Sequence, residues 1–247
     1  MAIALATLRM RQALPEAAPN YVNLNVTSMG KNVQYGINVS EVSPYNLTDG
    51  AGNLFENIWQ GCKVYPMVYP IQTVKYNKLY WQWGQEVHVE NGHVNAAYWN
   101  WRNHVFHNRY PLRYPNGRKH RHEALCALWF DGTVEGPLGS ESPGRWVTYD
   151  YITARKKIYC AWYSVLVKRT TGYQQLAWLL SQGQAFQFCE TDVRPAAQVT
   201  RELLIAELNN PRAPFGHCYV LSACLLGCED IWQDQPSEES IASSSAV

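Results

Sequence analysis

We predict an α+β fold, a helix-dominated single domain with a small N-terminal β region, from three features of the chain. Residues 21–42 alternate apolar and polar side chains, as strands with one buried face do. Residues 151–226 carry apolar side chains at helical spacing. Hydrophobic residues make up 47% of the chain and charged residues 17%, a balance that excludes a disordered protein and a coiled coil.

The length of 247 residues suits one large domain or two small ones, and it is sufficient for a hydrophobic core. We interpret residues 1–20, which contain Pro15 and Pro19, as an N-terminal lead-in. Residues 233–247 are rich in Ser and Glu, so we expect a disordered tail there. Neither a linker nor a repeat is evident between these ends, and the single domain is predicted to span 21–232.

The N-terminal β region is expected to contain two strands, over 21–28 and 32–42, joined by a turn at 29–32. Leu24 and Val26 occupy alternate positions and are predicted to face the core. The turn is indicated by Gly30, which the polar residues Lys31 and Asn32 follow.

A loop rich in turn-forming residues, 43–53, precedes a predicted helix over 54–62. Residues 65–110 are dense in aromatic side chains without a clear period, and we expect loops and short helices there. The second half is predicted to form helices over 151–169, 173–181, 195–209 and 216–226, with a strand over 185–189.

Charge and cysteine usage point to a cytoplasmic protein without a membrane partner. The formal net charge of +1 gives no general attraction to nucleic acids or membrane surfaces. The chain has no apolar run of about 18 residues and no secretory signal pattern at its start. Its seven cysteines form no C-x-x-C pair, which favours a reducing compartment.

The most informative motif lies in the predicted helix over 54–62. At 100° per residue, Glu56, Gln60 and Lys63 fall on one side of the helix, opposite an apolar side that includes Ile58 and Cys62. A carboxylate, an amide and an amine within two turns could form a catalytic group. Periodicity alone favours the solvated face of an ordinary amphipathic helix, and the spacing does not decide between the two interpretations.

The order Glu-x-x-aromatic-Gln-x-x-Lys over 56–63 resembles the signature helix of the NADAR superfamily, which includes riboflavin-intermediate N-glycosidases and ADP-ribosyl-guanine glycohydrolases. Ser43-Pro44-Tyr45 is similar to the segment that precedes that helix in the family. The order of elements over 151–228, with a strand that ends at Glu190, is also similar. Asn57 stands where the family has His, and Asp192 lacks the Trp-Gly pair that follows it in the family.

The resemblance implies a NADAR-like fold and an N-glycosidase. Lys63 would attack C1′ of an opened ribose to form a Schiff base, and Glu56 would be the general acid/base. This chemistry needs neither a metal nor a cofactor. The implied ligand is a ribosylated nucleotide or an ADP-ribose-like group, either free or on an ADP-ribosylated nucleic acid. The expected substrate contacts are Gln60, Trp59, Asn57, Glu190, Asp192 and Arg118.

Two other functions are considered. The first is a non-catalytic protein of the same fold that binds ADP-ribose or a nucleotide as a sponge or sensor. The second is a nucleic-acid-binding protein that uses the basic, aromatic segment 102–122, although that segment could also be a solvated loop.

Several further side chains have structural interpretations as well as functional ones. Glu190 and Asp192 could hydrate a strand end or cap a helix rather than hold a ribose. His217 is predicted to be a hydrogen-bonded core histidine. His120, His122 and Cys126 lack the spacing of a closed zinc site, so we expect no metal there.

Overall fold

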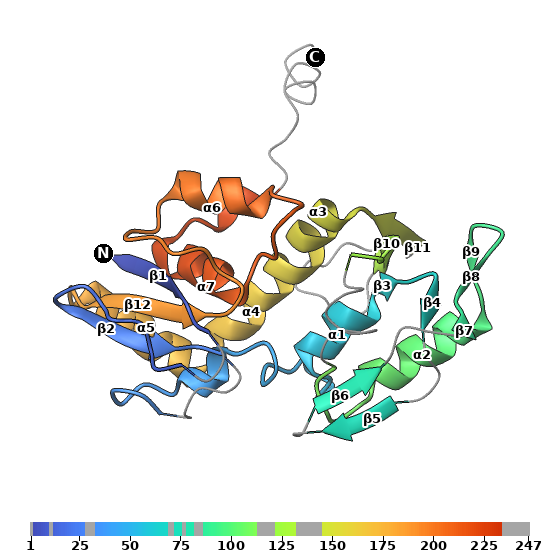
Figure 1. Cartoon of the computed structure of the whole chain (residues 1–247), viewed down its shortest axis with the longest axis horizontal. Coiled ribbons are helices and arrows are strands. Elements are labelled where there is room, and N and C mark those ends of the chain that lie inside the picture. Colours follow the sequence, from blue (N-terminus) through green and yellow to red (C-terminus); the bar gives the residue numbers. More distant parts are fainter. Residues whose placement is uncertain are drawn as a thin grey trace, which may run out of the picture. The chain divides into compact units, whose positions relative to one another are not determined.

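The computed structural model describes residues 2–9, 12–27, 33–68, 72–75, 78–81, 86–112, 122–131 and 145–233. It has a mixed α+β architecture, as predicted (Figure 1). The chain divides into two compact units. We call Met1–Ser40 together with Arg155–Val247 the terminal unit, and Glu41–Ala154 the central unit. The expected turn at 29–32 and the expected tail fall almost wholly outside the described residues.

The terminal unit is built on a parallel three-stranded sheet (Figure 1). Its central strand, β12 (Ala185–Glu190), pairs with β1 (Ile3–Thr7) on one side and β2 (Tyr21–Asn25) on the other. Leu24 and Val26 are fully buried, which confirms their predicted inward orientation. Ile3–Thr7 is largely buried within the sheet, so the lead-in interpretation does not hold for these residues.

Helices complete the terminal unit. They are the π-helical segment η3 (Arg155–Cys160), α4 (Ala161–Lys168), α5 (Thr171–Ser181), α6 (Arg201–Leu208), α7 (His217–Leu226) and the 3-10 helix η4 (Glu229–Trp232). The helix predicted over 216–226 is confirmed as the buried helix α7, because nine of its ten residues are buried. The helix expected from Pro195 begins only at Arg201, because Thr200 caps it by accepting from the backbone N–H of Leu203.

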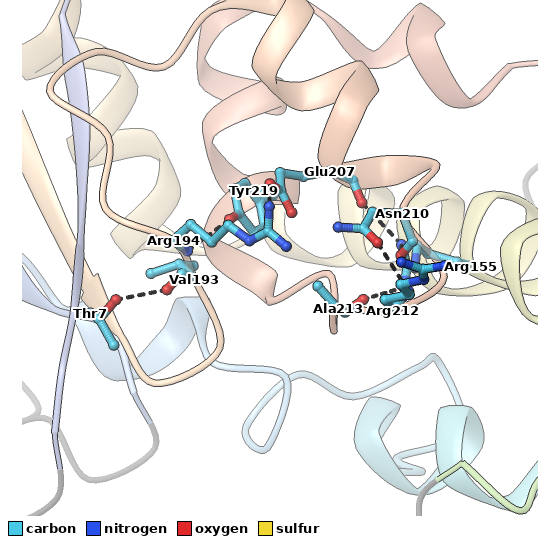
Figure 2. A network of polar contacts seen from close by, with 9 residues as sticks. All are labelled: Thr7, Arg155, Val193, Arg194, Glu207, Asn210, Arg212, Ala213 and Tyr219. Carbon is cyan, nitrogen blue, oxygen red and sulfur yellow. Dashed lines mark hydrogen bonds and ion pairs between the residues drawn. The ribbon is translucent and has the colours of Figure 1, made fainter.

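A buried arginine closes the end of α6 (Figure 2). Arg155 Nη1 donates to the backbone carbonyls of Glu207, Leu208 and Asn210, and Nη2 donates to that of Ala213 at 2.8 Å. The last carbonyls of a helix have no partner within the helix itself. Arg155 therefore supplies the donors that this buried helix end requires.

The central unit pairs two helices with an antiparallel sheet. Helix α1 (Phe55–Gly61) packs against α2 (Ala96–Phe106), and the sheet has the order β11-β10-β3. A β-carbon on Gly61 would lie 2.6 Å from a ring atom of Phe106, so the close approach of the helices requires glycine. The sheet strands are β3 (Lys63–Val64), β10 (Cys126–Asp131) and β11 (Arg145–Tyr149), and α3 (Tyr151–Ala154) follows β11.

Two expectations for strands and loops were wrong. Of the loops and short helices expected over 65–110, the helix α2 is confirmed. Residues 65–94, however, contain short antiparallel strand pairs: β4 (Met67–Val68) with β7 (Glu86–Val87), β5 (Gln72–Lys75) with β6 (Lys78–Trp81), and β8 (Val89–Glu90) with β9 (His93–Val94). Strands of two to four residues are too short to show a period. Conversely, the described part of 32–42 is not a strand. Tyr35 and Gly36 adopt positive φ in a turn, and the 3-10 helix η1 (Val39–Val42) follows.

No helix among the described residues is both long enough and apolar enough to cross a membrane.

Candidate functional site

Helix α1 starts where a loop provides its first acceptors. The backbone N–H of Phe55 donates to the carbonyl of Leu47 at 2.8 Å, and that of Glu56 donates to the carbonyl of Pro44 at 3.2 Å. Glu56 lies in the first turn, where the helix dipole favours a negative charge. The helix ends at Gly61, and Lys63 begins strand β3. The predicted helix over 54–62 is thus confirmed to within one residue at each end.

Glu56, Gln60 and Lys63 form a continuous chain of side-chain hydrogen bonds. Gln60 Nε2 donates to Glu56 Oε1 at 2.7 Å, and Lys63 Nζ donates to Gln60 Oε1 at 2.9 Å. The amide is thereby oriented, with its nitrogen toward the carboxylate and its oxygen toward the amine. The three side chains that the sequence placed on one side of the helix do meet. We call them the Glu56–Gln60–Lys63 chain.

This chain does not lie on a solvated helix face. Glu56 is 6% exposed and Gln60 is 7% exposed, and every residue of α1 is buried. The alternative of an ordinary amphipathic helix with a solvated polar side is therefore wrong. Burying a carboxylate and an amide is unfavourable unless they are hydrogen-bonded, which explains why the bonds within the chain are needed.

The amine of Lys63 also contacts an aromatic ring. Its Nζ lies 4.4 Å from the centre of the Trp59 ring, and the Trp59 ring lies 6.5 Å from that of Tyr151. The ring face of Trp59 and the amide oxygen of Gln60 are both groups that an ammonium group contacts favourably. The neighbouring Cys62 is a poor nucleophile, because burial raises the pKa of its thiol to about 11.

Asn57, an expected substrate contact, makes structural bonds here. It is fully buried, and its Nδ2 donates to the carbonyls of Asn108 at 2.8 Å and Tyr110 at 3.1 Å. Its Oδ1 accepts from the backbone N–H of Leu112 at 2.6 Å. The side chain therefore holds the segment that follows α2 against α1.

Glu190, by contrast, belongs to the terminal unit and lies at the start of α7. Its Oε1 is 2.8 Å from His217 Nδ1, and its Oε2 accepts from the backbone N–H of Cys218 at 3.0 Å. Gly216 precedes the helix and has no side chain to cap it, so Glu190 takes that role. Of its two interpretations, helix capping is observed, although the helix is α7 rather than the one after Pro195.

Both side chains of the Glu190–His217 pair have further hydrogen-bond partners. His217 Nε2 lies 2.8 Å from the carbonyl oxygen of Val26, which only accepts, so Nε2 carries a proton. Burial alone would raise the pKa of Glu190, but the charge and hydrogen bond of His217 and the N–H of Cys218 outweigh it, and the pKa is lowered. The carboxylate form of Glu190 is therefore favoured. The prediction that His217 is a hydrogen-bonded core residue is confirmed.

Glu190, His217 and Cys218 bring three metal-ligand types together, with their donor atoms all within 4.8 Å of one another. No local sequence pattern indicates this cluster, because Glu190 lies far from His217 and Cys218 along the chain. Burial, followed by the nearby Glu190 charge, raises the pKa of the Cys218 thiol well above its ordinary value. The thiolate that binds metals is therefore disfavoured, and the hydrogen bonds above already account for the cluster.

The basic segment 102–122 is only partly described. Arg102 is buried, and its Nη1 donates to Tyr98 Oη at 3.1 Å and to the carbonyl of Leu128 at 2.7 Å. It therefore belongs to the core rather than to a nucleic-acid-binding surface. Arg118, His120 and the rest of 113–121 lie outside the described residues. Asp192 is half-buried after β12. Like Glu190, it belongs to the terminal unit, so its place in one site with Lys63 stays a prediction.

Comparison of the chain with protein families, with curated protein sequences and with solved structures gives no significant match.

Proposed function

We propose that this protein is an N-glycosidase that uses Lys63 to cleave the bond between ribose and a base in a ribosylated nucleotide or an ADP-ribosyl adduct. One observation carries the proposal: the Glu56–Gln60–Lys63 chain joins a buried carboxyl group to an amine through an oriented amide. The resemblance of 56–63 to the NADAR signature helix supports the same reaction.

The first step opens the ribose. Glu56, as the carboxylic acid, gives a proton to the ring oxygen O4′. The C1′–O4′ bond breaks, and the lone pair of the base nitrogen forms a C1′=N double bond. This produces an electrophilic C1′, at which an amine can add.

In the second step, Lys63, which has released its ammonium proton to solvent as the ligand covers it, adds to C1′ through its neutral amine. A proton passes from Nζ to the base nitrogen, the bond from C1′ to that nitrogen breaks, and the base leaves with the electron pair. A protonated Schiff base then joins Nζ to C1′. Water adds to C1′ and gives a proton to the Glu56 carboxylate. The proton of the new hydroxyl group then passes to Nζ, the C1′–Nζ bond breaks, and the sugar aldehyde is released with both residues restored.

The surroundings of Lys63 suit this role in two ways. Gln60 fixes the amine at one end of the chain, so that its position is set before the ligand binds. The ring of Trp59 forms an apolar flank beside Nζ. A ligand that covers the amine would exclude water and thereby favour the neutral, nucleophilic form.

A Schiff-base trap tests the proposal. The full chain is incubated with ADP-ribose, whose C1′ is an aldehyde in the open form, and with ADP-ribosylated guanosine, and borohydride then reduces any imine to a stable amine. We expect a covalent adduct that peptide mass spectrometry places on Lys63. The adduct should be absent in Lys63→Ala and unchanged in Lys157→Ala, which removes an exposed lysine.

Other outcomes would contradict the proposal in distinguishable ways. An intact ligand that raises the melting temperature without forming an adduct would indicate the non-catalytic nucleotide-binding protein. The absence of both an adduct and thermal protection would mean that the Glu56–Gln60–Lys63 chain has a structural role alone.

A further inference from the structure

The strand register of the central unit places Lys63 in a row with two other residues. Lys63 on β3 is directly opposite Ala127 on β10, and Ala127 is directly opposite Tyr149 on β11. Directly opposed residues of antiparallel strands point to the same face of the sheet. Lys63 and Tyr149 therefore share one face, with two strand spacings, roughly 10 Å, between their backbones.

The other face of this sheet is the one that α2 covers. Leu128 packs in a core cluster with Tyr98 and Trp101 of α2, and the ring of Trp146 lies 4.7 Å from that of Trp99. Leu128 and Trp146 alternate with Ala127 and Tyr149 along their strands, so they point away from Lys63. The Lys63 face is thus separate from the α2 core.

Large aromatic side chains lie on the Lys63 face and beside it. Trp129 lies two residues beyond Ala127, so it shares the face, and both Trp129 and Tyr149 are half-buried. Tyr151 follows Tyr149 by two residues, is 41% exposed, and its ring lies 6.5 Å from that of Trp59. Partly exposed aromatic rings of this kind are typical surfaces for stacking a flat ring system.

We infer that Tyr149, with Tyr151 and Trp129 beside it, determines specificity by stacking on the base that leaves in the reaction. This rests on the proposed function, because it takes Lys63 as the group that bonds to C1′. The base is attached directly to C1′, so it is the part of the ligand that must lie within reach of the side chains around Lys63. The substrate class is therefore a glycoside of a flat aromatic base, held by ring stacking.

Two ligands separate the role of Tyr149 from that of Lys63. ADP-ribose has the aldehyde carbon but no leaving base, whereas ADP-ribosylated guanosine has both. In Tyr149→Leu we expect the borohydride adduct with ADP-ribose to form as in the wild type, and KM for ADP-ribosylated guanosine to rise about tenfold, within the range measured for loss of one base–aromatic stack. Tyr149→Phe, which keeps the ring, should restore the wild-type KM.

A control residue lies on the same strand. Thr148 is exposed and points to the opposite face, so Thr148→Ala should change neither readout. Far-ultraviolet circular dichroism and the melting temperature establish that each variant is folded. If Tyr149→Leu is unfolded, the comparison of Tyr151→Leu with Tyr151→Phe replaces it.

The failures of the two proposals are distinguishable. An unchanged KM in Tyr149→Leu, or an adduct lost with ADP-ribose as well, would overturn the stacking role while Lys63 remains the nucleophile. If the wild type forms no adduct, the proposed function fails. Binding of guanosine, followed by tryptophan fluorescence, then still tests the stacking surface, and equal affinity in the wild type and Tyr149→Leu would overturn it.

Discussion

The carboxylate of Glu190 lies so close to the backbone of Gly216 that a β-carbon on that glycine would stand 2.5 Å from Oε2. No real β-carbon tolerates this distance. The carboxylate is held in place from both sides, by His217 and by the backbone N–H of Cys218. The capping of α7 by Glu190 therefore requires glycine at position 216.

Gly216→Ala should consequently destabilise the protein. The new methyl group must displace a buried, paired carboxylate, which we expect to lower the free energy of unfolding by about 1–3 kcal/mol. Urea unfolding measures the change. Gly50→Ala is a matched control, because a β-carbon there would meet no atom within 4 Å. Equal stability of Gly216→Ala and wild type would show that the carboxylate can move.

We expect the protein to lose stability in mild acid because of the buried His88. Its ring is fully buried, and neither nitrogen has a hydrogen-bond partner in the part of the chain that the structure describes. Burial lowers its pKa from 6.5 to about 4. The unfolded chain therefore takes up a proton more readily than the folded one. Stability should fall as the pH decreases from about 6.5 to about 4, by about 3 kcal/mol in total from this residue.

His88→Leu provides the comparison for this effect. Leucine fills the site without a titratable group, so the slope of stability against pH between 6.5 and 4.5 should become smaller. The Glu190 carboxyl, whose pKa is lowered, loses its stabilising charge only at lower pH, below the ordinary value of 4.5. Urea unfolding at several pH values measures the slopes, and identical slopes would contradict the assignment to His88.

Asn57→Ala tests whether the asparagine is structural. The substitution removes three hydrogen bonds and leaves the carbonyls of Asn108 and Tyr110 without that donor. We expect the free energy of unfolding to fall by about 2–4 kcal/mol. Asn103→Ala, at an exposed position of α2, should change it by less than about 0.5 kcal/mol. A stable Asn57→Ala with impaired ligand binding would instead support the predicted substrate contact.

Glu56→Gln tests the proposed acid. Glutamine can still accept the hydrogen bond from Gln60 but has no acidic proton for O4′. The kcat for ADP-ribosylated guanosine should fall about 100-fold or more while KM changes little. Release of guanosine, followed by chromatography, measures this. Glu123→Gln, an exposed control, should match the wild type. A wild-type kcat in Glu56→Gln would remove Glu56 from the reaction.

Helices with a clear pattern of apolar residues could be predicted from the sequence. Helix α1 was found because seven residues alternate clearly between an apolar and a polar side, and α7 because ten nearly continuous apolar residues follow Gly216. The same reasoning placed Glu56, Gln60 and Lys63 on one side of the helix. It could not show that this side is buried, because burial depends on what packs against the helix.

Contacts distant in sequence were not predictable. The pairing of β1 with β12 joins residues more than 180 positions apart, and no local pattern encodes it. The partners of Asn57 are carbonyl groups of a loop, which any residue type would present. The pairing of Glu190 with His217 depends likewise on where a strand end meets a helix start. Such contacts follow from the tertiary fold.

The position of β12 has a consequence for folding during synthesis. Both of its partners, β1 and β2, lie within the first 25 residues, whereas β12 itself begins at Ala185. When the ribosome has made the whole of Glu41–Ala154, that segment can already form its own helices and sheet. Strands β1 and β2, by contrast, have no partner strand until β12 has been made, because both of them pair with β12. The two strands that are made first thus complete their sheet only after β12, about 160 residues later, has been made.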